Sequence, residues 1–215
     1  MIYLLCEGHG EPLALSNLVT RLWTDLQLPH IPIRTPAIRY PGISSERGLN
    51  KALSIIRNRS AISGLLVVAD QEDICPKTSG PAMSMVLSDA CLPFPASYHV
   101  MYREYETLFL PSLQTMAGKA LIDDRGIKRK GIREGAIFVG NPEANRDAKG
   151  IISDFMQDGR RYKPTLDQLP LTRMIDFDKL RDSMLPCFGT LERCLRHLSE
   201  NHHRQGVYPP PRPIS

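Results

Sequence analysis

The sequence predicts an α/β fold, in which a mainly parallel sheet is flanked by helices and followed by a helical C-terminal extension. The first observation is the apolar run of residues 64–69, because a strand that is buried on both faces is continuously apolar. The second is the alternation of strand-like and helical patterns along residues 1–101, as expected for a parallel sheet with right-handed crossovers. The third is size, since 215 residues, 42% of them hydrophobic, can bury one core with a small appendage.

The N-terminal half accounts for most of the predicted sheet. Residues 2–6 form a short apolar strand, and residues 13–26 carry apolar side chains at helical spacing. Prolines in and beside residues 30–40 restrict that segment to an edge strand. Residues 45–59 predict a second helix, which leads into the central strand at residues 63–70.

The next elements extend the sheet and then leave it. A helix is predicted at residues 79–91 and a strand at residues 97–101. Residues 103–110 alternate charged and apolar side chains as a half-exposed strand does, and a helix that begins at Glu106 is the alternative. Residues 114–121 are compatible with a further helix.

The chain is predicted to have three parts. Residues 1–125 form the α/β core. Residues 126–200 form a basic loop and a helical extension packed on that core, with helices at residues 151–156 and 175–198. Residues 201–215 are rich in proline and have too little to bury, which predicts a flexible tail.

Composition limits the class of protein. A balance of 27 Lys+Arg against 23 Asp+Glu is mildly basic and compatible with a polyanionic partner. The sequence has no apolar window of about 18 residues and no signal-peptide pattern. Five cysteines without paired spacing fit reduced thiols, so we expect a cytoplasmic protein. A zinc site at Cys187, Cys194 and His197 is the weaker interpretation, because no second ligand pair accompanies them.

Acidic residues follow two of the predicted strands. Asp70, Glu72 and Asp73 come at the end of the central strand, and Glu7 follows the first strand. If these strands are neighbours, their carboxylates converge where α/β sheets bind ligands. Such an oxygen-rich group suits Mg²⁺ or Mn²⁺. The alternatives are a solvated acidic turn and, for Glu7, stabilisation of a helix N-terminus.

These segments resemble a known family. Residues 4–11, Leu-Leu-Cys-Glu-Gly-His-Gly-Glu, are similar to the strand-Glu-Gly-x-x-Glu opening of Toprim domains, and residues 67–73 resemble their strand ending in Asp-x-Asp. The chain looks most like small stand-alone Toprim-like proteins related to the nuclease half of overcoming-lysogenization-defect (OLD) proteins. Residues 104–109 resemble that family's Glu-Phe-Glu-aromatic segment, and residues 162–164 and 175–188 its C-terminal pattern. The likeness implies a Toprim-like, Rossmann-like fold.

The resemblance also implies roles for individual residues. Glu7 would be a metal ligand and a general acid or base, and Asp70 and Glu72 would be the Asp-x-Asp pair, with Glu in place of the second Asp. Asp73 would share that role, and Glu11 and Glu104 are candidate ligands of a second ion. The positive charges expected to contact nucleic acid are Lys128, Arg129, Lys130 and Lys149. For Lys128, Arg129 and Lys130 the alternative is a solvated basic loop, and for Glu104 and Glu106 it is a half-exposed strand.

The function expected from this resemblance is a Mg²⁺- or Mn²⁺-dependent endonuclease that hydrolyses DNA or RNA phosphodiesters. The family implies an ATPase partner encoded nearby, a role in antiviral defence, and leaves assembly into a homo-oligomer open. The first alternative is a non-catalytic Toprim-fold subunit that regulates or binds an ATPase. The second is a metal-dependent phosphatase that acts on small phosphates.

Overall fold

The main sheet is parallel throughout. The computed structural model describes residues 1–8, 10–71 and 73–212. Five strands pair in the order β2-β1-β3-β4-β7, and all four pairings are parallel. Their bounds are β1 (Ile2–Cys6), β2 (Ile38–Arg39), β3 (Gly64–Gln71), β4 (Ala96–Tyr102) and β7 (Val207–Tyr208). The prediction of an α/β fold with a mainly parallel sheet is therefore confirmed.

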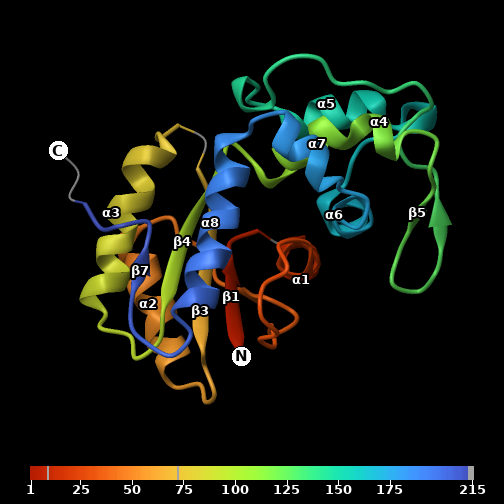
Figure 1. Ribbon diagram of the computed structural model, residues 1–215. Helices are drawn as coiled ribbons and strands as arrows, with labels where there is room; N and C mark the ends of the chain where they lie inside the picture. The colour runs from red at the N-terminus through yellow and green to blue at the C-terminus, as the bar shows by residue number, and fades with distance from the viewer. Residues whose placement is uncertain (9, 72, 213–215) are drawn as a thin grey trace.

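Helices cover both faces of this sheet (Figure 1). Along β1 and β3, alternate side chains point to opposite faces, as the two-residue period of a strand requires. Leu4, Leu66 and Val68 belong to the core that contains α1 (Glu11–Asp25) and α8 (Pro186–Glu200). Leu5 and Val67 belong to the core under α2 (Glu46–Arg57) and α3 (Pro76–Asp89).

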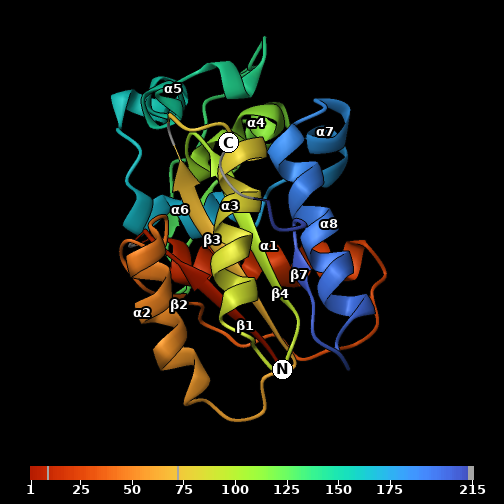
Figure 2. The same cartoon turned by 90° about the vertical axis from the view of Figure 1, so that its left-hand side faces the viewer.

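The segment between β4 and α8 forms an extension beyond the carboxyl ends of the strands, and both views of the ribbon show it there (Figures 1 and 2). It shares a hydrophobic core with β1 and α1, which includes Phe109, Ile152 and Leu171. The elements of this segment are η1 (Tyr105–Ser112), α4 (Leu113–Met116), β5 (Leu121–Ile122), β6 (Lys128–Arg129), η2 (Pro142–Ala144), α5 (Ala148–Phe155), η3 (Gln157–Gly159), α6 (Pro164–Thr172) and α7 (Phe177–Asp182).

Three segments differ from the sequence-based expectations. Residues 103–110 do not form a strand, because β4 has already ended at Tyr102; the 3₁₀ helix η1 begins at Tyr105, close to the alternative of a helix from Glu106. The single helix expected at residues 175–198 is divided into α7 and α8, since Met184 has a φ of 51° and Leu185 is extended before Pro186. Within residues 201–215, expected as a flexible tail, β7 pairs with β4 through Ala96 and Val207 and supplies the sheet edge.

The strand order places a topological switch point between β1 and β3. The chain passes from β1 outward to β2 and then returns to β3 on the other side of β1. In doubly wound sheets of this order, the loops after the two central strands diverge to opposite faces and leave a crevice at their carboxyl ends. The residues that follow β1 and β3 therefore occupy the position where α/β proteins bind ligands.

Candidate functional site

Two acidic side chains lie at this switch point. Glu7 directly follows β1, and Asp70 is the penultimate residue of β3. The strands are hydrogen-bonded neighbours, with Leu5 opposite Val67, so both acids lie at the carboxyl end of the parallel strands. The strand adjacency on which the predicted convergence depended is thus confirmed.

Glu7 is held by one of its two carboxylate oxygens. Its Oε1 accepts hydrogen bonds from the backbone N–H of Gly42 at 2.8 Å and from the hydroxyl of Ser44 at 3.2 Å. Its Oε2 is buried and accepts no hydrogen bond from any of the residues that the structure describes. A buried carboxylate oxygen without a donor costs free energy, so this atom is available to a proton or a cation.

Glu11 folds back over the turn that connects β1 to α1. Its Oε2 accepts the backbone N–H of Glu7 at 3.1 Å, and its side chain is almost fully buried. Burial raises the pKa of Glu11, hydrogen bonds from the N–H groups of Gly8 and Glu7 oppose the rise, and the charge of Glu7 adds to it. The carboxylate therefore stabilises this turn while adding negative charge beside Glu7.

Gly8 provides the space that Glu11 needs. A Cβ at position 8 would lie 2.2 Å from Oε1 of Glu11, which no real contact allows. We expect Gly8→Ala to displace the Glu11 carboxylate and lower the free energy of unfolding by about 1–3 kcal/mol, measured by urea denaturation.

Gly189→Ala is the matched control for this substitution. Position 189 lies within α8, and an added Cβ would be 3.5 Å from Nη1 of Arg193, which is an ordinary contact distance. Alanine should therefore leave the free energy of unfolding unchanged or raise it by about 0.5–1 kcal/mol. Equal effects of the two substitutions would contradict the packing role assigned to Gly8.

Asp70 carries the clearest sign of unbalanced negative charge. Burial raises the pKa of Asp70 well above its usual range, and the charges of Glu11, Glu106 and Glu104 raise it further, whereas Lys149 opposes the shift. Asp70 therefore lies within electrostatic range of three carboxylates and one ammonium group. Charge of this kind favours binding of a proton or a cation.

Two glutamates contact the side chain of Lys149. Glu104 directly precedes η1, and Glu106 lies within it. The ammonium Nζ of Lys149 lies 3.5 Å from Oε1 of Glu104 and 3.6 Å from Oε2 of Glu106. Tyr162 donates its hydroxyl to the other oxygen of Glu106 at 2.8 Å. Burial raises the pKa of Glu106. Burial lowers the pKa of Lys149, but the charges of Glu106, Glu104 and Asp70 outweigh this effect and raise it.

The other acids of the predicted cluster contribute less to this site. Asp73 forms an exposed ion pair with Arg146, at 2.7 Å between Oδ1 and Nη1. Glu72, the second acid of the predicted pair, lies outside the described residues. Asp73 is thus partnered at the surface, and its proposed share in metal binding stays a prediction.

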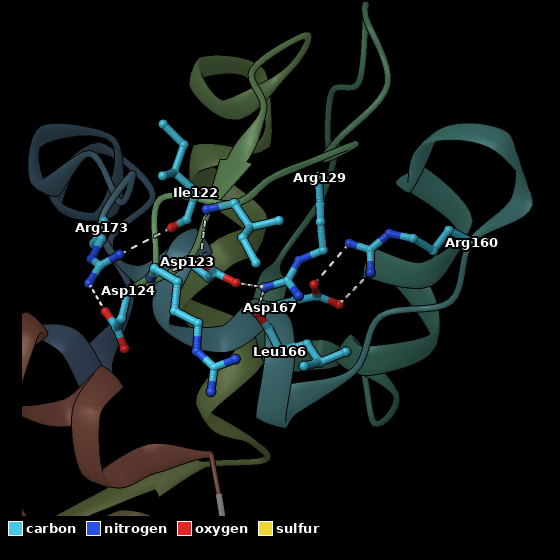
Figure 3. Close-up of polar contacts among 10 residues, drawn as sticks. Ile122, Asp123, Asp124, Arg129, Arg160, Leu166, Asp167 and Arg173 are labelled. Carbon is cyan, nitrogen blue, oxygen red and sulfur yellow. Dashed lines mark hydrogen bonds and ion pairs between the residues drawn. The ribbon is translucent and has the colours of Figure 1, made fainter.

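Most of the predicted basic residues lie on or directly after the β5–β6 hairpin. Arg129 pairs with Asp123 at 3.3 Å and donates to the carbonyl of Leu166 (Figure 3). Lys130 pairs with Asp158, whereas exposed Lys128 has no partner within the described part of the chain. Arg129 and Lys130 therefore carry structural ion pairs, which weakens their charge toward a ligand.

A groove of about 560 Å³ connects this hairpin with the start of α1. Arg125 and Arg129 line it on one side and Gly10 and Pro12 on the other, together with Asp123. The groove therefore reaches Gly10 at the start of α1, and the carboxylates of Glu7, Glu11 and Asp70 do not line it.

The acidic side chains fit a hard divalent cation. Carboxylate oxygens are the donors that Mg²⁺ and Mn²⁺ prefer, and the unpartnered Oε2 of Glu7 is a free donor atom. Among residues 1–8, 10–71 and 73–212, no group of three or more His, Cys, Asp or Glu side chains is assembled as a metal site. Mg²⁺ commonly keeps several waters and is held through one or two carboxylates. The Glu7 carboxylate is held by Gly42 and Ser44, and Glu7 is not among the charges that shift the pKa of Asp70, so joint binding of one ion by Glu7 and Asp70 stays a prediction.

Sequence patterns did not identify two parts of this site. Glu106 was not proposed as a member, because alternating charges in residues 103–110 suggested a half-exposed strand, yet its side chain is 2% exposed. The hydrogen bonds that Gly42 and Ser44 donate to Glu7 correspond to no sequence motif. The spacing of Gly8 and Glu11 was the available signal for the turn, since a carboxylate four residues after Glu7 can reach its backbone N–H.

Comparisons with known proteins do not place the chain in a family. No protein-family model, curated protein or solved structure matches it. The Toprim-like resemblance therefore stays a prediction. None of the helices in the described part of the chain is long and apolar enough to cross a membrane.

Proposed function

We propose that this protein is a Mg²⁺- or Mn²⁺-dependent phosphodiester hydrolase that cleaves nucleic acid. The observation that carries the proposal is the group of carboxylates around Asp70 at the carboxyl end of β3, where burial and the charges of Glu11, Glu106 and Glu104 raise the pKa of Asp70. A surplus of negative charge at a ligand-binding edge is a reason to expect a cation there.

Each side chain has a proposed role in metal or phosphate binding. Glu7 and Asp70 are the proposed ligands, with Glu72 as a further ligand on the strength of the Toprim-like resemblance. A divalent ion supplies charge stabilisation of the phosphate and an activated water. Lys149 adds a positive charge beside the same carboxylates, where it can stabilise a phosphate oxygen. The role of Glu7 as a general acid or base rests on the Toprim-like resemblance.

Nucleic acid is the proposed substrate because Arg125 and Arg129 of the basic hairpin line a groove that reaches Gly10, the residue before Glu11. Lys128 and Arg125 are exposed on that hairpin, and phosphate backbones bind through such lysines and arginines. The ATPase partner and the role in antiviral defence rest on the resemblance alone and belong to the same proposal.

Cleavage of plasmid DNA and of RNA in the presence of Mg²⁺ or Mn²⁺ tests this function. We expect metal-dependent cleavage that Glu7→Gln reduces by at least about 100-fold, because loss of even an outer-shell partner of a metal ligand typically lowers metal affinity or activity by about 10–100-fold. Glu46→Gln, at an exposed position in the first turn of α2, is the control and should leave the rate unchanged.

Substrate comparison separates the proposed activity from related ones. Turnover of small phosphomonoesters without cleavage of either nucleic acid would assign a phosphatase instead. Absence of any cleavage with both metals, with and without an ATPase encoded beside this protein, would reject the hydrolase.

One observation favours a second candidate, the non-catalytic subunit that binds an ATPase. A groove of about 900 Å³ lies between α3 and α8 and is lined by Tyr102, Phe188 and exposed Met184, with Lys77 and Arg212 also lining it. An apolar groove of this size can accept a segment of another protein. Co-purification with the neighbouring ATPase tests this candidate, and a solitary monomer would count against it.

A further inference from the structure

We propose that the edge of β4 that faces away from β3 binds an extended, acidic segment of another protein as an added strand. This edge lies in the groove of about 900 Å³ between α3 and α8, and β4 lies between the two helices (Figure 2). The inference goes beyond the hydrolase and does not depend on it. It specifies how a partner would bind in the groove that favours the second candidate.

The two edges of β4 are distinguished by their backbone hydrogen bonds. Arg103, directly after β4, donates its backbone N–H to Gln71 of β3, whereas Ala96 donates to Gly206 on the opposite side. Every second residue of a strand directs its N–H and C=O to the same side. Val100, four residues after Ala96, therefore directs its backbone groups away from β3.

Among the described residues, no strand pairs with β4 opposite Val100. The pairing with β7 extends only as far as Ser97, which lies opposite Tyr208. The outward N–H and C=O of Val100 therefore have no hydrogen-bond partner in the described part of the chain. Val100 is buried yet lines the groove, so its unpaired groups cost free energy that pairing with another strand recovers.

Proline explains why β7 leaves this edge open. In the register of its pairing with β4, the residue two places after Tyr208 would donate its N–H to the C=O of Tyr98. That residue is Pro210, and proline has no N–H to donate. The chain crosses to α3 instead, where Arg212 donates its backbone N–H to Pro81. The groove therefore continues beyond the end of β7.

Apolar side chains line the groove beside this edge. Tyr102 and Phe188 are part of its lining, and Met184 is 84% exposed there. Gly189 leaves room in the wall that α8 forms, where an added Cβ would lie 3.5 Å from Nη1 of Arg193. The side chains of an added strand would point alternately to the two sides of the sheet, so apolar residues at every second position fit this lining.

The charges that line the groove without an ion pair are positive. They belong to three exposed residues, Lys77, Arg193 and Arg212. Within residues 1–8, 10–71 and 73–212, none of the three forms an ion pair. Of the acids in the lining, Glu192 pairs with Arg181, and Glu143 accepts the backbone N–H of Cys187. Charge complementarity therefore favours an acidic segment.

The unpaired backbone groups favour a peptide over a nucleic acid. A peptide strand can accept the N–H of Val100 and donate an N–H to its C=O, as strands do when they are added to a sheet edge. The phosphodiester backbone of a nucleic acid offers acceptors alone. The partner is therefore a protein segment in extended conformation.

Selection of displayed random peptides on the full chain, followed by fluorescence anisotropy with the selected peptides, tests this site. We expect peptides in which apolar residues alternate with others and in which Asp or Glu is enriched. N-methylation at alternate peptide residues should weaken binding by at least about 10-fold, because only every second N–H of an added strand pairs with β4. N-methylation at the residues between them should leave binding unchanged.

Substitutions in the groove place the peptide on the structure. Gly189→Leu puts a side chain into the groove and should weaken peptide binding by at least about 10-fold. Gly189→Ala is the matched control and should bind as the wild type does. Lys77→Glu combined with Arg212→Glu should weaken binding by about 10-fold. Lys51→Glu combined with Arg196→Glu changes the net charge equally at exposed positions outside the groove and should leave binding unchanged.

Several results would overturn the proposal. They include selection of no peptide, selected peptides without acidic residues, and binding that neither N-methylation nor Gly189→Leu reduces. Self-association of the wild type that Gly189→Leu prevents would assign the groove to a second copy of this chain instead. Binding of single-stranded DNA, and not of peptides, that Gly189→Leu prevents would assign it to nucleic acid.

The test stands apart from folding defects and from the proposed hydrolase. Circular dichroism shows whether each variant is folded, and the N-methylation pattern is measured on the wild type alone. None of these measurements depends on cleavage of a phosphodiester. Failure of peptide binding would therefore leave the hydrolase standing, and absence of cleavage would leave this binding site standing.

Discussion

Asp70→Asn should abolish metal-dependent cleavage and at the same time stabilise the metal-free protein. The substitution removes a proposed ligand, so we expect the cleavage rate to fall by at least about 100-fold. It also removes a carboxylate that burial and the charges of Glu11 and Glu106 hold in an unfavourable state. The free energy of unfolding should rise by about 1 kcal/mol at neutral pH, or roughly 2–4 °C in Tm for a chain of this size.

The stabilisation should depend on pH with a defined sign. The pKa of Asp70 is raised in the folded state, so the folded protein binds a proton more tightly than the unfolded chain does. The stability from that proton is fully present below the ordinary Asp pKa of about 3.9 and is lost as the pH rises through the raised value. The Tm advantage of Asp70→Asn over the wild type should therefore grow from acidic pH toward pH 8.

Thermal unfolding between acidic pH and pH 8, with and without Mg²⁺, measures these effects. Added Mg²⁺ should raise the Tm of the wild type and leave that of Asp70→Asn unchanged, because only a bound ligand stabilises the folded state. Asp89→Asn, at the exposed end of α3, is the control and should match the wild type throughout. A lower Tm for metal-free Asp70→Asn, or unimpaired cleavage, would contradict the charge surplus assigned to Asp70.

Arg160→Ala should produce the largest loss of stability in the C-terminal extension. Asp167 is fully buried in α6, and Arg160 donates to both of its oxygens, at 3.0 and 2.9 Å (Figure 3). Without the guanidinium, the buried carboxylate keeps the backbone N–H of Lys163, at 2.8 Å. Because breaking a buried ion pair leaves an uncompensated charge, the free energy of unfolding should fall by about 2–4 kcal/mol, measured by urea denaturation.

Two further variants show whether the pair itself is responsible. Arg161→Ala removes the exposed neighbouring arginine and should change stability by less than about 0.5 kcal/mol. Adding Asp167→Asn to Arg160→Ala removes the uncompensated charge and should restore part of the loss. A single Arg160→Ala variant as stable as the wild type would show that solvent compensates Asp167.

Elements with a strong local pattern were predicted well. The apolar run before Asp70 predicted β3 (Gly64–Gln71), and the helical spacing after Gly10 predicted α1 (Glu11–Asp25). In both, neighbouring residues carry enough information, because a buried strand and an amphipathic helix each have a characteristic period. By contrast, the sequence analysis does not predict α6 (Pro164–Thr172), which has Pro164 at its start and Pro170 within it.

The sequence by itself determined the parallel α/β class and the positions of Glu7 and Asp70 at strand ends, since both follow from short-range patterns. Only the tertiary structure decided that β1 lies beside β3, which brings those acids to one switch point. It also decided which acids already have a cation: Lys149 reaches Glu104 across 45 residues of sequence, through the docking of α5 on η1. No local pattern encodes that contact, because it depends on how two distant elements share one hydrophobic core.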